Sequence, residues 1–230
     1  MQSQYYVGLM YDKGIGTKKN KHEAIKWYTK SGQQGNSDAQ FNLALIFNLG
    51  TDGIPQDIYK AIYWYEEAGK QNNAKALFNL GTIYYEGTSI QRDINKAEKF
   101  LIQSANLGYA AAQFNLGIFY YSGKYVNKDF KKSFYWFSKS IENGDNSAQI
   151  YLGSMYLNGE GVDQDFKKAF EMYLKAAKSG DPASQYNTAI MYINGMGVTK
   201  DLNQAKYWLK IAKNNNFPEA QKALDKLEGK

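Results

Sequence analysis

Few side chains in this sequence are of the types that catalyse reactions or bind metals. The chain has one histidine, His22, beside Glu23, and it has no cysteine. A histidine-based catalytic triad or metal cluster needs partner residues that this neighbourhood does not supply. Asp163 and Asp165 are a close acidic pair that would suit a weak cation site, although helix capping explains them better. We therefore expect no cofactor, no metal site and no enzymatic activity, and nothing in the sequence selects a pair of carboxylates for catalysis.

The sequence is organised by an internal repeat that fills the chain. Near-copies of the stretch AQFNLGIFYYSG recur along its whole length, for example ALFNLGTIYYEG and AQIYLGSMYLNG. Alignment on this stretch gives six units and a closing half-unit, and such a period is typical of stacked helical repeats. The units are residues 3–38, 39–75, 76–111, 112–147, 148–183 and 184–219, and the half-unit is 220–230.

Each unit carries the signals of two helices, A and B, joined by a loop. With the first residue of a unit counted as position 0, position 11 is glycine in all six units, as expected for the left-handed residue that ends a helix. An Asn or Asp follows the loop where helix B needs a side-chain cap. These cap residues are Asn20, Asp57, Asp93, Asp129, Asp165 and Asp201. Neither helix can bury its apolar surface alone, so the units must stack into one α-solenoid domain.

Two glycines of helix A have different explanations. Position 5, Gly117 in the fourth unit, is alanine in two other units, so its requirement is for a small residue where another helix packs closely. Position 11, Gly123 in the same unit, never accepts alanine and is expected at positive φ. We expect Gly123→Ala to be destabilising and Gly117→Ala to be comparatively mild.

The consensus A-x-x-x-L-G-x-x-Y-x-x-G-x-G-V-x-x-D-x-x-K-A-x-x-W-Y-x-K-A-A resembles the Sel1-like repeat, a relative of the tetratricopeptide repeat. The fifth unit, AQIYLGSMYLNGEGVDQDFKKAFEMYLKAAKSGD, departs from it mainly at Met172, and the first unit departs at Lys21, where an apolar residue is usual. The resemblance covers essentially the whole chain. It implies an all-α fold, a right-handed α/α superhelical solenoid of six helix–loop–helix repeats plus a C-terminal capping helix.

One narrow arc of helix A stays polar when its residues are placed at 100° intervals. Position 3 lies on this arc, and we call its residues the asparagine row: Tyr6, Asn42, Asn79, Asn115, Tyr151 and Asn187. In the tetratricopeptide relatives the same concave face holds extended peptides, so the resemblance implies that the four asparagines hydrogen-bond a partner chain. Flanking pockets would come from Leu9, Leu45, Ile118 and Ile190, and specificity from position 10, which includes Lys13, Glu86, Asn158 and Asn194. The alternative is that the asparagines are structural and bond a neighbouring loop.

The net charge of +6 and the pI of about 9.1 raise nucleic acid and anionic membranes as partners. However, the lysines are spread over the outward face of helix B and interleaved with glutamates, without a basic stripe of stacking aromatics. We expect no nucleic-acid binding. No apolar run reaches the roughly 20 residues of a membrane span, so we expect no membrane insertion. No signal peptide is visible, which leaves the cytoplasm, or the periplasm or exterior if a leader was trimmed.

The sequence therefore favours a non-enzymatic scaffold or adaptor that binds a protein or peptide on the concave helix-A face. Proteins with repeats that look like these act in bacterial signalling, immunity and host interaction. Two alternatives remain: a protein that binds or hydrolyses cell-wall fragments, which in cysteine-rich relatives relies on disulfides that this chain lacks, and a self-associating structural module. The oligomeric state is open at this point, and light scattering would test the self-associating module.

Overall fold

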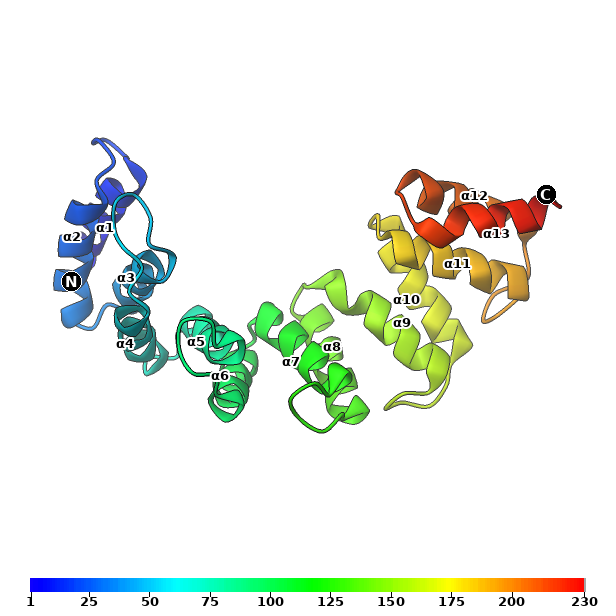
Figure 1. The fold of residues 1–230 in the computed structure, drawn as a ribbon, viewed down its shortest axis with the longest axis horizontal. Helices are drawn as coiled ribbons and strands as arrows, with labels where there is room; N and C mark the ends of the chain where they lie inside the picture. The colour runs from blue at the N-terminus through cyan, green and yellow to red at the C-terminus, as the bar shows by residue number, and fades with distance from the viewer. Residues whose placement is uncertain (230) are drawn as a thin grey trace. The chain divides into compact units, whose positions relative to one another are not determined.

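The computed structural model describes residues 1–229, and these residues form helices and connecting turns without a strand (Figure 1). The all-α prediction is confirmed. The chain divides into two compact units, Met1–Ala112 and Gln113–Lys230, with three repeats in each. Whether the two behave as the single expected domain stays a prediction.

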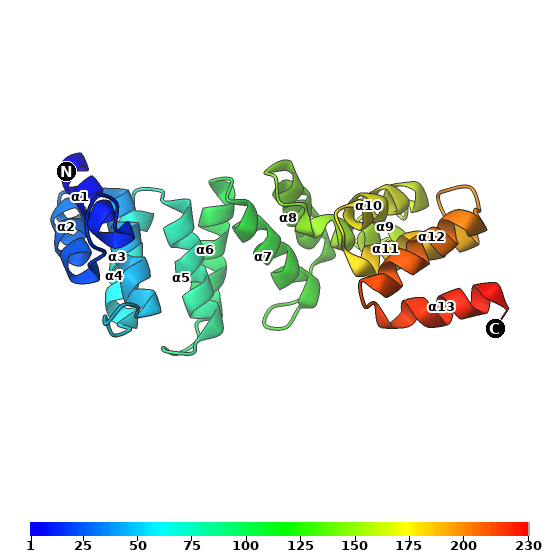
Figure 2. The same ribbon diagram turned by 90° about the horizontal axis from the view of Figure 1, so that it is seen from above.

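The first unit consists of three antiparallel pairs of helices A and B (Figure 2). Their bounds are α1 (Gln2–Lys13), α2 (Lys21–Gln33), α3 (Ser37–Leu49), α4 (Ile58–Gly69), α5 (Ala74–Glu86) and α6 (Ile94–Asn106). Each helix A packs on the helix B of its own repeat, and α2 and α4 also pack on the helix A that follows.

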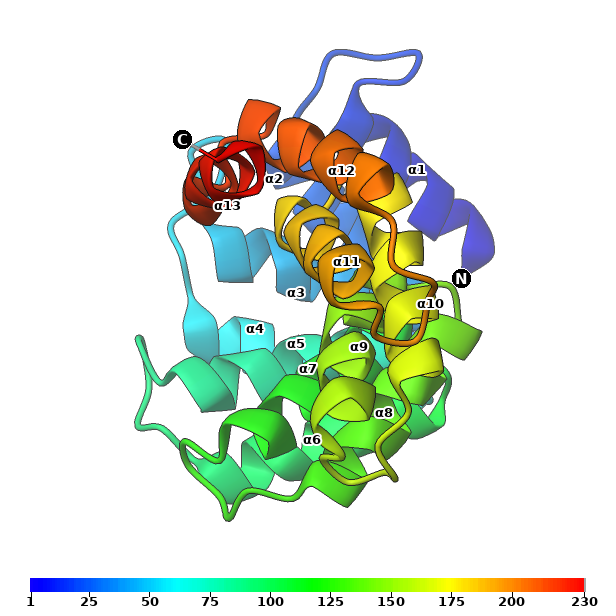
Figure 3. The same cartoon turned by 90° about the vertical axis from the view of Figure 1, so that its right-hand side faces the viewer.

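The second unit repeats this plan and ends with an extra helix (Figure 3). Its elements are α7 (Ala110–Ser122), which starts just before the division, α8 (Phe130–Glu142), the 3₁₀ turn η1 (Asn146–Ala148), α9 (Gln149–Asn158), α10 (Phe166–Lys178), α11 (Pro182–Asn194), α12 (Leu202–Asn214) and α13 (Pro218–Glu228). Helix α13 packs on α12 and covers the apolar surface that α12 would otherwise expose. It is the expected capping helix.

The loop signals are confirmed in all six repeats. The position-11 glycines have φ between 61° and 72°, and their left-handed conformation ends helix A. Each predicted cap residue accepts a hydrogen bond from a backbone amide in the first turn of helix B, for example Asp57 from Lys60 at 3.1 Å and Asp129 from Lys132 at 3.0 Å. These two local rules therefore set both ends of every loop.

Helix A begins earlier than the aligned stretch suggests. Helices α3, α5 and α11 start two residues before the predicted units, and α13 starts at Pro218 instead of residue 220. The reason is a second set of caps that the alignment did not consider: Asn36, Asn73 and Asp181 each accept from the amide three residues on.

The position-5 glycines pack against a large buried side chain of helix B. A Cβ atom added to Gly117 would lie 2.8 Å from Cγ of Phe137, with two further ring carbons closer still, and one added to Gly153 would lie 2.9 Å from the ring of Tyr173. The close-packing interpretation is confirmed. The expectation that Gly117→Ala is mild needs correction, because the neighbour is a fully buried aromatic ring and not a flexible chain end.

Candidate partner-binding face

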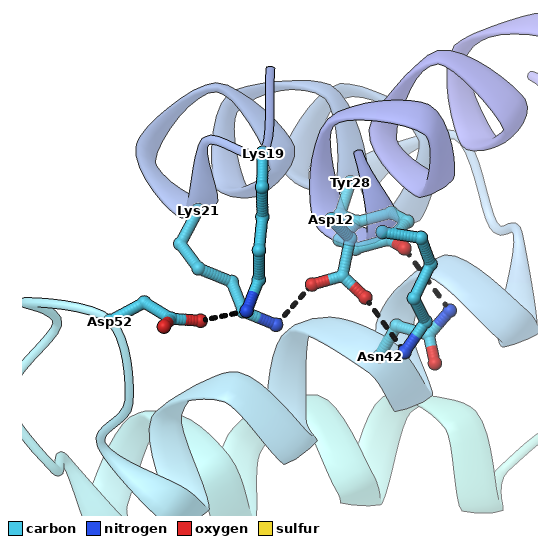
Figure 4. Close-up of polar contacts among 7 residues, drawn as sticks. Asp12, Lys19, Lys21, Tyr28, Asn42 and Asp52 are labelled. Carbon is cyan, nitrogen blue, oxygen red and sulfur yellow. Dashed lines mark hydrogen bonds and ion pairs between the residues drawn. The ribbon is translucent and has the colours of Figure 1, made fainter. Parts of the chain in front are cut away.

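In the first unit, the asparagine row is anchored to buried tyrosines of helix B. The Nδ2 group of Asn79 donates a 2.9 Å hydrogen bond to the hydroxyl of Tyr65. Asn42 makes the same contact with Tyr28 at 3.5 Å, close to the limit for a hydrogen bond (Figure 4). Both tyrosines are fully buried and both asparagines are half-buried. The anchor uses the N–H side of each carboxamide and leaves the carbonyl Oδ1 out of this bond.

The tyrosine anchors are neutral over the physiological pH range. Burial raises the pKa of Tyr65 to about 12, although hydrogen bonds from Asn79 and Asn48 act in the opposite direction. Burial also raises the pKa of Tyr28. Because both hydroxyls stay protonated, the anchors hold the asparagines without adding charge to this face.

The second unit uses other contacts at the same positions. Tyr151 stacks on Phe137, with ring centroids 4.8 Å apart and planes at 15°. Asn115 and Asn187 are half-buried. The residue fourteen positions before Asn187 is Tyr173, whose pKa burial raises to about 12 while a hydrogen bond from Ser154 opposes the shift.

The structural alternative for the asparagines is therefore correct in part. For Asn42 and Asn79 the bond goes to a helix B tyrosine and not to a loop. Such a bond orients the carboxamide and does not occupy its oxygen, so it is compatible with partner binding, which stays a prediction.

The flanking positions differ in how far they reach solvent. Leu9, Leu45, Ile118 and Ile190 are all half-buried, whereas Tyr6, Lys13, Glu86, Asn158 and Asn194 are exposed. Glu86 lines a polar pocket of about 180 Å³ with Asn48 and Thr88. The side chain of Asn158 donates to Ser154 at 3.4 Å. Each unit thus has half-buried apolar side chains and exposed polar ones within a turn of its asparagine row.

The first repeat adds a charged cluster that sequence reasoning missed (Figure 4). Asp12 is buried and pairs with Lys21, and Lys13 lies 3.3 Å from its second oxygen. In the next loop, Asp52 pairs with Lys19 at 2.8 Å, and this ion pair lowers the pKa of Asp52. Lys21 stands where the five later repeats have Ile58, Ile94, Phe130, Phe166 and Leu202. In the sequence, the lysine at position 21 is recognisable as unusual. Nothing in the sequence identifies Asp12 as its ion-pair partner.

The outward lysines of helix B make regular contacts within their own repeats. Lys60, Lys96, Lys132 and Lys168 each lie within 3.0 to 3.9 Å of the cap aspartate three residues before. The same four ammonium groups lie 4.8 to 5.3 Å from the ring centres of Phe47, Tyr84, Tyr120 and Tyr156. These four lysines are therefore engaged within their own repeats, where they contact both the cap of helix B and a ring of helix A.

The residues with catalytic potential are placed as structural ones. His22 is exposed at the second residue of α2, and Asp165 caps α10 through the amide of Lys168 at 3.0 Å. The capping interpretation of Asp165 is confirmed, and Asp163 is exposed in the loop. Within residues 1–229, no group of three or more His, Cys, Asp or Glu side chains is placed to hold a metal ion.

The helix starts agree with the limits of a known repeat. A sequence model of the Sel1 repeat matches residues 2–36, 37–73, 74–109, 110–145, 146–181 and 182–217, and these six segments open at the first residue of α1, α3, α5, α7, η1 and α11. The chain belongs to the Sel1 repeat family. The resemblance seen in the consensus is confirmed, and Sel1 repeats generally mediate protein–protein interaction.

Solved Sel1 repeat proteins have the same fold. A protective antigen of uropathogenic Escherichia coli with an SLR fold is 31% identical, with a TM-score of 0.89 over 98% of this chain and 48% of the antigen. A Sel1 repeat protein from Oxalobacter formigenes is 32% identical, with a TM-score of 0.71 over 92% of this chain and 84% of its own. Together with the six repeats, these likenesses identify the fold as an all-α solenoid.

Curated Sel1-type relatives match over shorter stretches. The rat DAP3-binding cell death enhancer 1 is 42% identical over 52 residues, which are 23% of this chain and 10% of that protein. A sel1-like repeat-containing protein of Acanthamoeba polyphaga mimivirus is 59% identical over 34 residues, or 15% of this chain and 6% of its own. This chain therefore spans about half of the E. coli antigen and a tenth or less of these two curated relatives.

Among residues 1–229, no helix has both the length and the apolar character of a membrane span.

Proposed function

We propose that this Sel1 repeat chain is a non-enzymatic scaffold that binds an extended segment of a partner polypeptide along the asparagine row. The observation that carries the proposal is the bond from Asn79 to Tyr65. A free asparagine must lose rotamer freedom before it can bind a peptide, and each side chain immobilised on binding costs about 0.5–1.5 kcal/mol. The buried hydroxyl has already fixed this carboxamide. Its Oδ1 acceptor is thus ready for a backbone N–H.

The neighbouring side chains fit an extended peptide. Leu45 is half-buried near this row, and Glu86 is exposed beside the polar pocket. An extended peptide alternates backbone polar groups with side chains, so it needs both fixed polar partners and shallow apolar sites. The first unit offers both, and position 10 varies between repeats as a specificity position should.

The non-enzymatic part of the proposal is supported by the carboxyl groups. The pKa is lowered for Asp52 by Lys19 and for Asp57 and Asp165 by the backbone amides that they cap. A carboxylic acid that donates a proton near neutral pH needs the opposite shift. A role in host interaction is the cellular setting we favour, because the solved relative with the higher TM-score of the two is named a protective antigen.

A peptide library displayed on phage tests this function. We expect selection of peptides that the purified chain binds, with affinity reduced about fivefold or more by Asn79→Ala, the usual effect of losing one hydrogen bond. Tyr65→Phe is the matched control, since it keeps the carboxamide and removes only its anchor, and we expect a smaller loss. Peptides that bind wild type and Asn79→Ala equally would remove the asparagine row from the mechanism.

A further inference from the structure

A buried glutamine near the start of helix A connects successive repeats. The Nε2 group of Gln40 donates to the carbonyl of Gly32 at the end of α2 (2.8 Å), and its Oε1 accepts from Gln71 (2.7 Å). Gln185 repeats this pattern, donating to the carbonyl of Ala177 (3.2 Å) and accepting from Asn215 (2.9 Å). The two ends of the carboxamide are thus bonded to two successive inter-helix turns.

The partner of the Oε1 atom is set by the residue about thirty positions later. Gln113 accepts from Asn143 at 3.1 Å, and in the third repeat Leu77 replaces the glutamine while Leu107 replaces its partner. The pair is therefore either amide with amide or leucine with leucine. The first repeat has the amide pair Gln4 and Gln34, but there Oε1 of Gln4 is buried without a hydrogen-bond partner.

In the fifth repeat the residue opposite the glutamine is neither an amide nor a leucine. Gln149 is 7% exposed, and its Nε2 group donates to Asn146 within the η1 turn at 2.9 Å, while its Oε1 has no hydrogen-bond partner. The residue thirty positions later is Ser179, which is too short to reach and whose hydroxyl donates to the carbonyl of Lys175 at 3.2 Å. A buried acceptor is left unsatisfied, which costs free energy unless an added group supplies the donor.

Gln149 is one of the residues that line a pocket of about 500 Å³. The pocket is lined by Gln149, Asn146, Ser179 and Asp181, with Ile150 forming part of its apolar wall. Asp181 is its one charged lining residue, and no lysine or arginine lines it. The volume is far larger than the roughly 30 Å³ that one water molecule occupies.

The turn beside the pocket has already used its own donors. The amides of Gly180 and Asp181 donate to the carbonyls of Ala177 and Ala176, each at 3.1 Å. One oxygen of Asp181 accepts from the amide of Ser184 at 2.6 Å. The site therefore offers an amide oxygen and a carboxylate, and what it lacks is a cationic N–H donor.

We infer that this pocket binds a guanidinium group, as carried by an arginine side chain. Guanidinium has five N–H donors in one plane, is weakly hydrated, and forms charge-assisted bonds with carboxylates. Its methylene stem would lie against Ile150. The site lies between inter-helix turns of the second unit and does not depend on peptide binding by the asparagine row.

The matched variant is Ser179→Asn, which restores the residue type found at 143 and 215. We expect the new carboxamide to donate to Gln149 and to occupy the pocket without loss of stability. Asp181→Asn is the second variant, because asparagine caps a helix as well as aspartate does and removes only the charge.

The test is a titration of the ¹⁵N-labelled chain with Nα-acetyl-L-argininamide, followed by NMR at the side-chain amide of Gln149 and at residues 146–150 and 179–181. We expect saturable shifts in the millimolar range, with affinity reduced about tenfold or more by Ser179→Asn and severalfold by Asp181→Asn. Nα-acetyl-L-citrullinamide, which has the same shape without the charge, should bind more weakly.

Several results would overturn the inference. They are the absence of saturable shifts in the wild type, as for a pocket that holds only water; equal binding by Ser179→Asn; and equal binding of the blocked lysine derivative. Free L-arginine distinguishes the source of the guanidinium group, because Asp181 should repel its carboxylate. Tighter binding of the blocked residue supports an arginine within a polypeptide, and tighter binding of free arginine supports a small-molecule ligand.

Discussion

Helices α7 and α8 approach closely at Gly117. We predict that Gly117→Ala destabilises the chain when residue 137 is phenylalanine and does not when it is leucine. An added Cβ would lie 2.8 Å from Cγ of Phe137. The ring has little room to retreat, since it is fully buried, stacks on Tyr151 at 4.8 Å and contacts Phe114 with ring centres 5.8 Å apart. We therefore expect overpacking to cost about 2–3 kcal/mol, near the upper end of its usual range.

The gain in helix propensity partly offsets this cost. Replacing a mid-helix glycine by alanine stabilises a helix by about 1 kcal/mol. The net effect of Gly117→Ala should thus be a loss of about 1–2 kcal/mol. In the sixth repeat the corresponding residues are Ala189 and Leu209, and in the second they are Ala44 and Tyr65, so two repeats accommodate an alanine at this position beside a fully buried helix B side chain.

Phe137→Leu removes ring carbons that the added Cβ would meet, and it should rescue Gly117→Ala. On the Phe137→Leu background we expect Gly117→Ala to be neutral or stabilising by up to about 1 kcal/mol, which corresponds to a coupling energy of about 2 kcal/mol. The assay is urea unfolding followed by far-ultraviolet circular dichroism. The wild type, the two single variants and the double variant are compared with one common slope of unfolding free energy against urea concentration.

Gly123→Ala is the matched control. Its φ of 61° is unfavourable for alanine by about 1–2 kcal/mol whatever stands at position 137. Its cost should be the same on both backgrounds. If Gly117→Ala also costs the same on both, Phe137 is not what excludes a side chain at position 117, and the packing argument fails.

Two further predictions concern charge. The pKa of Asp165 is lowered, mainly by the backbone amide of Lys168, so the stability that this carboxylate contributes is present above pH 3.8 and is lost as the pH falls toward the folded-state pKa. Asp165→Asn keeps the cap and should reduce the loss of urea resistance on acidification. An unchanged pH profile would contradict this assignment. Removing one partner of the buried pair in the first repeat, as in Lys21→Met, should cost about 2–3 kcal/mol, while Asp12→Leu with Lys21→Ile should be neutral or stabilising. Hydrogen exchange of α1 and α2 measures the stability of the first repeat in both variants. A double variant less stable than Lys21→Met would refute the argument that apolar residues can replace this ion pair, as they do at position 21 in the later repeats.

The parts of the fold that the sequence predicts are those set by local chemistry. Gly123 and Asp129 illustrate this: a left-handed turn and a helix cap depend on residues within four positions of each other. The aligned stretch predicts the starts of α3 and α5 two residues late, because the caps Asn36 and Asn73 precede that stretch.

The site was less predictable because its contacts join different helices. The bond between Tyr65 and Asn79 spans fourteen residues and two helices, and the tyrosine follows a tryptophan that dominates the helix B pattern. The glutamine of the fifth repeat gives no signal by itself either. The missing donor is recognised only by comparing repeats. Asn215 follows Gln185 by thirty residues and donates to it, whereas Ser179 stands thirty residues after Gln149.

The central claim is that the anchored carboxamide of Asn79 binds a partner backbone, and an N-methyl scan of a selected peptide tests it most directly. Each backbone N–H of the peptide is replaced by N–CH₃ in turn, and the affinity is measured for wild type and Asn79→Ala. We predict one position at which methylation weakens binding to wild type about fivefold or more and has little effect on Asn79→Ala, because the same hydrogen bond is already lost. Methylation that weakens binding to both chains equally at every position would contradict the account.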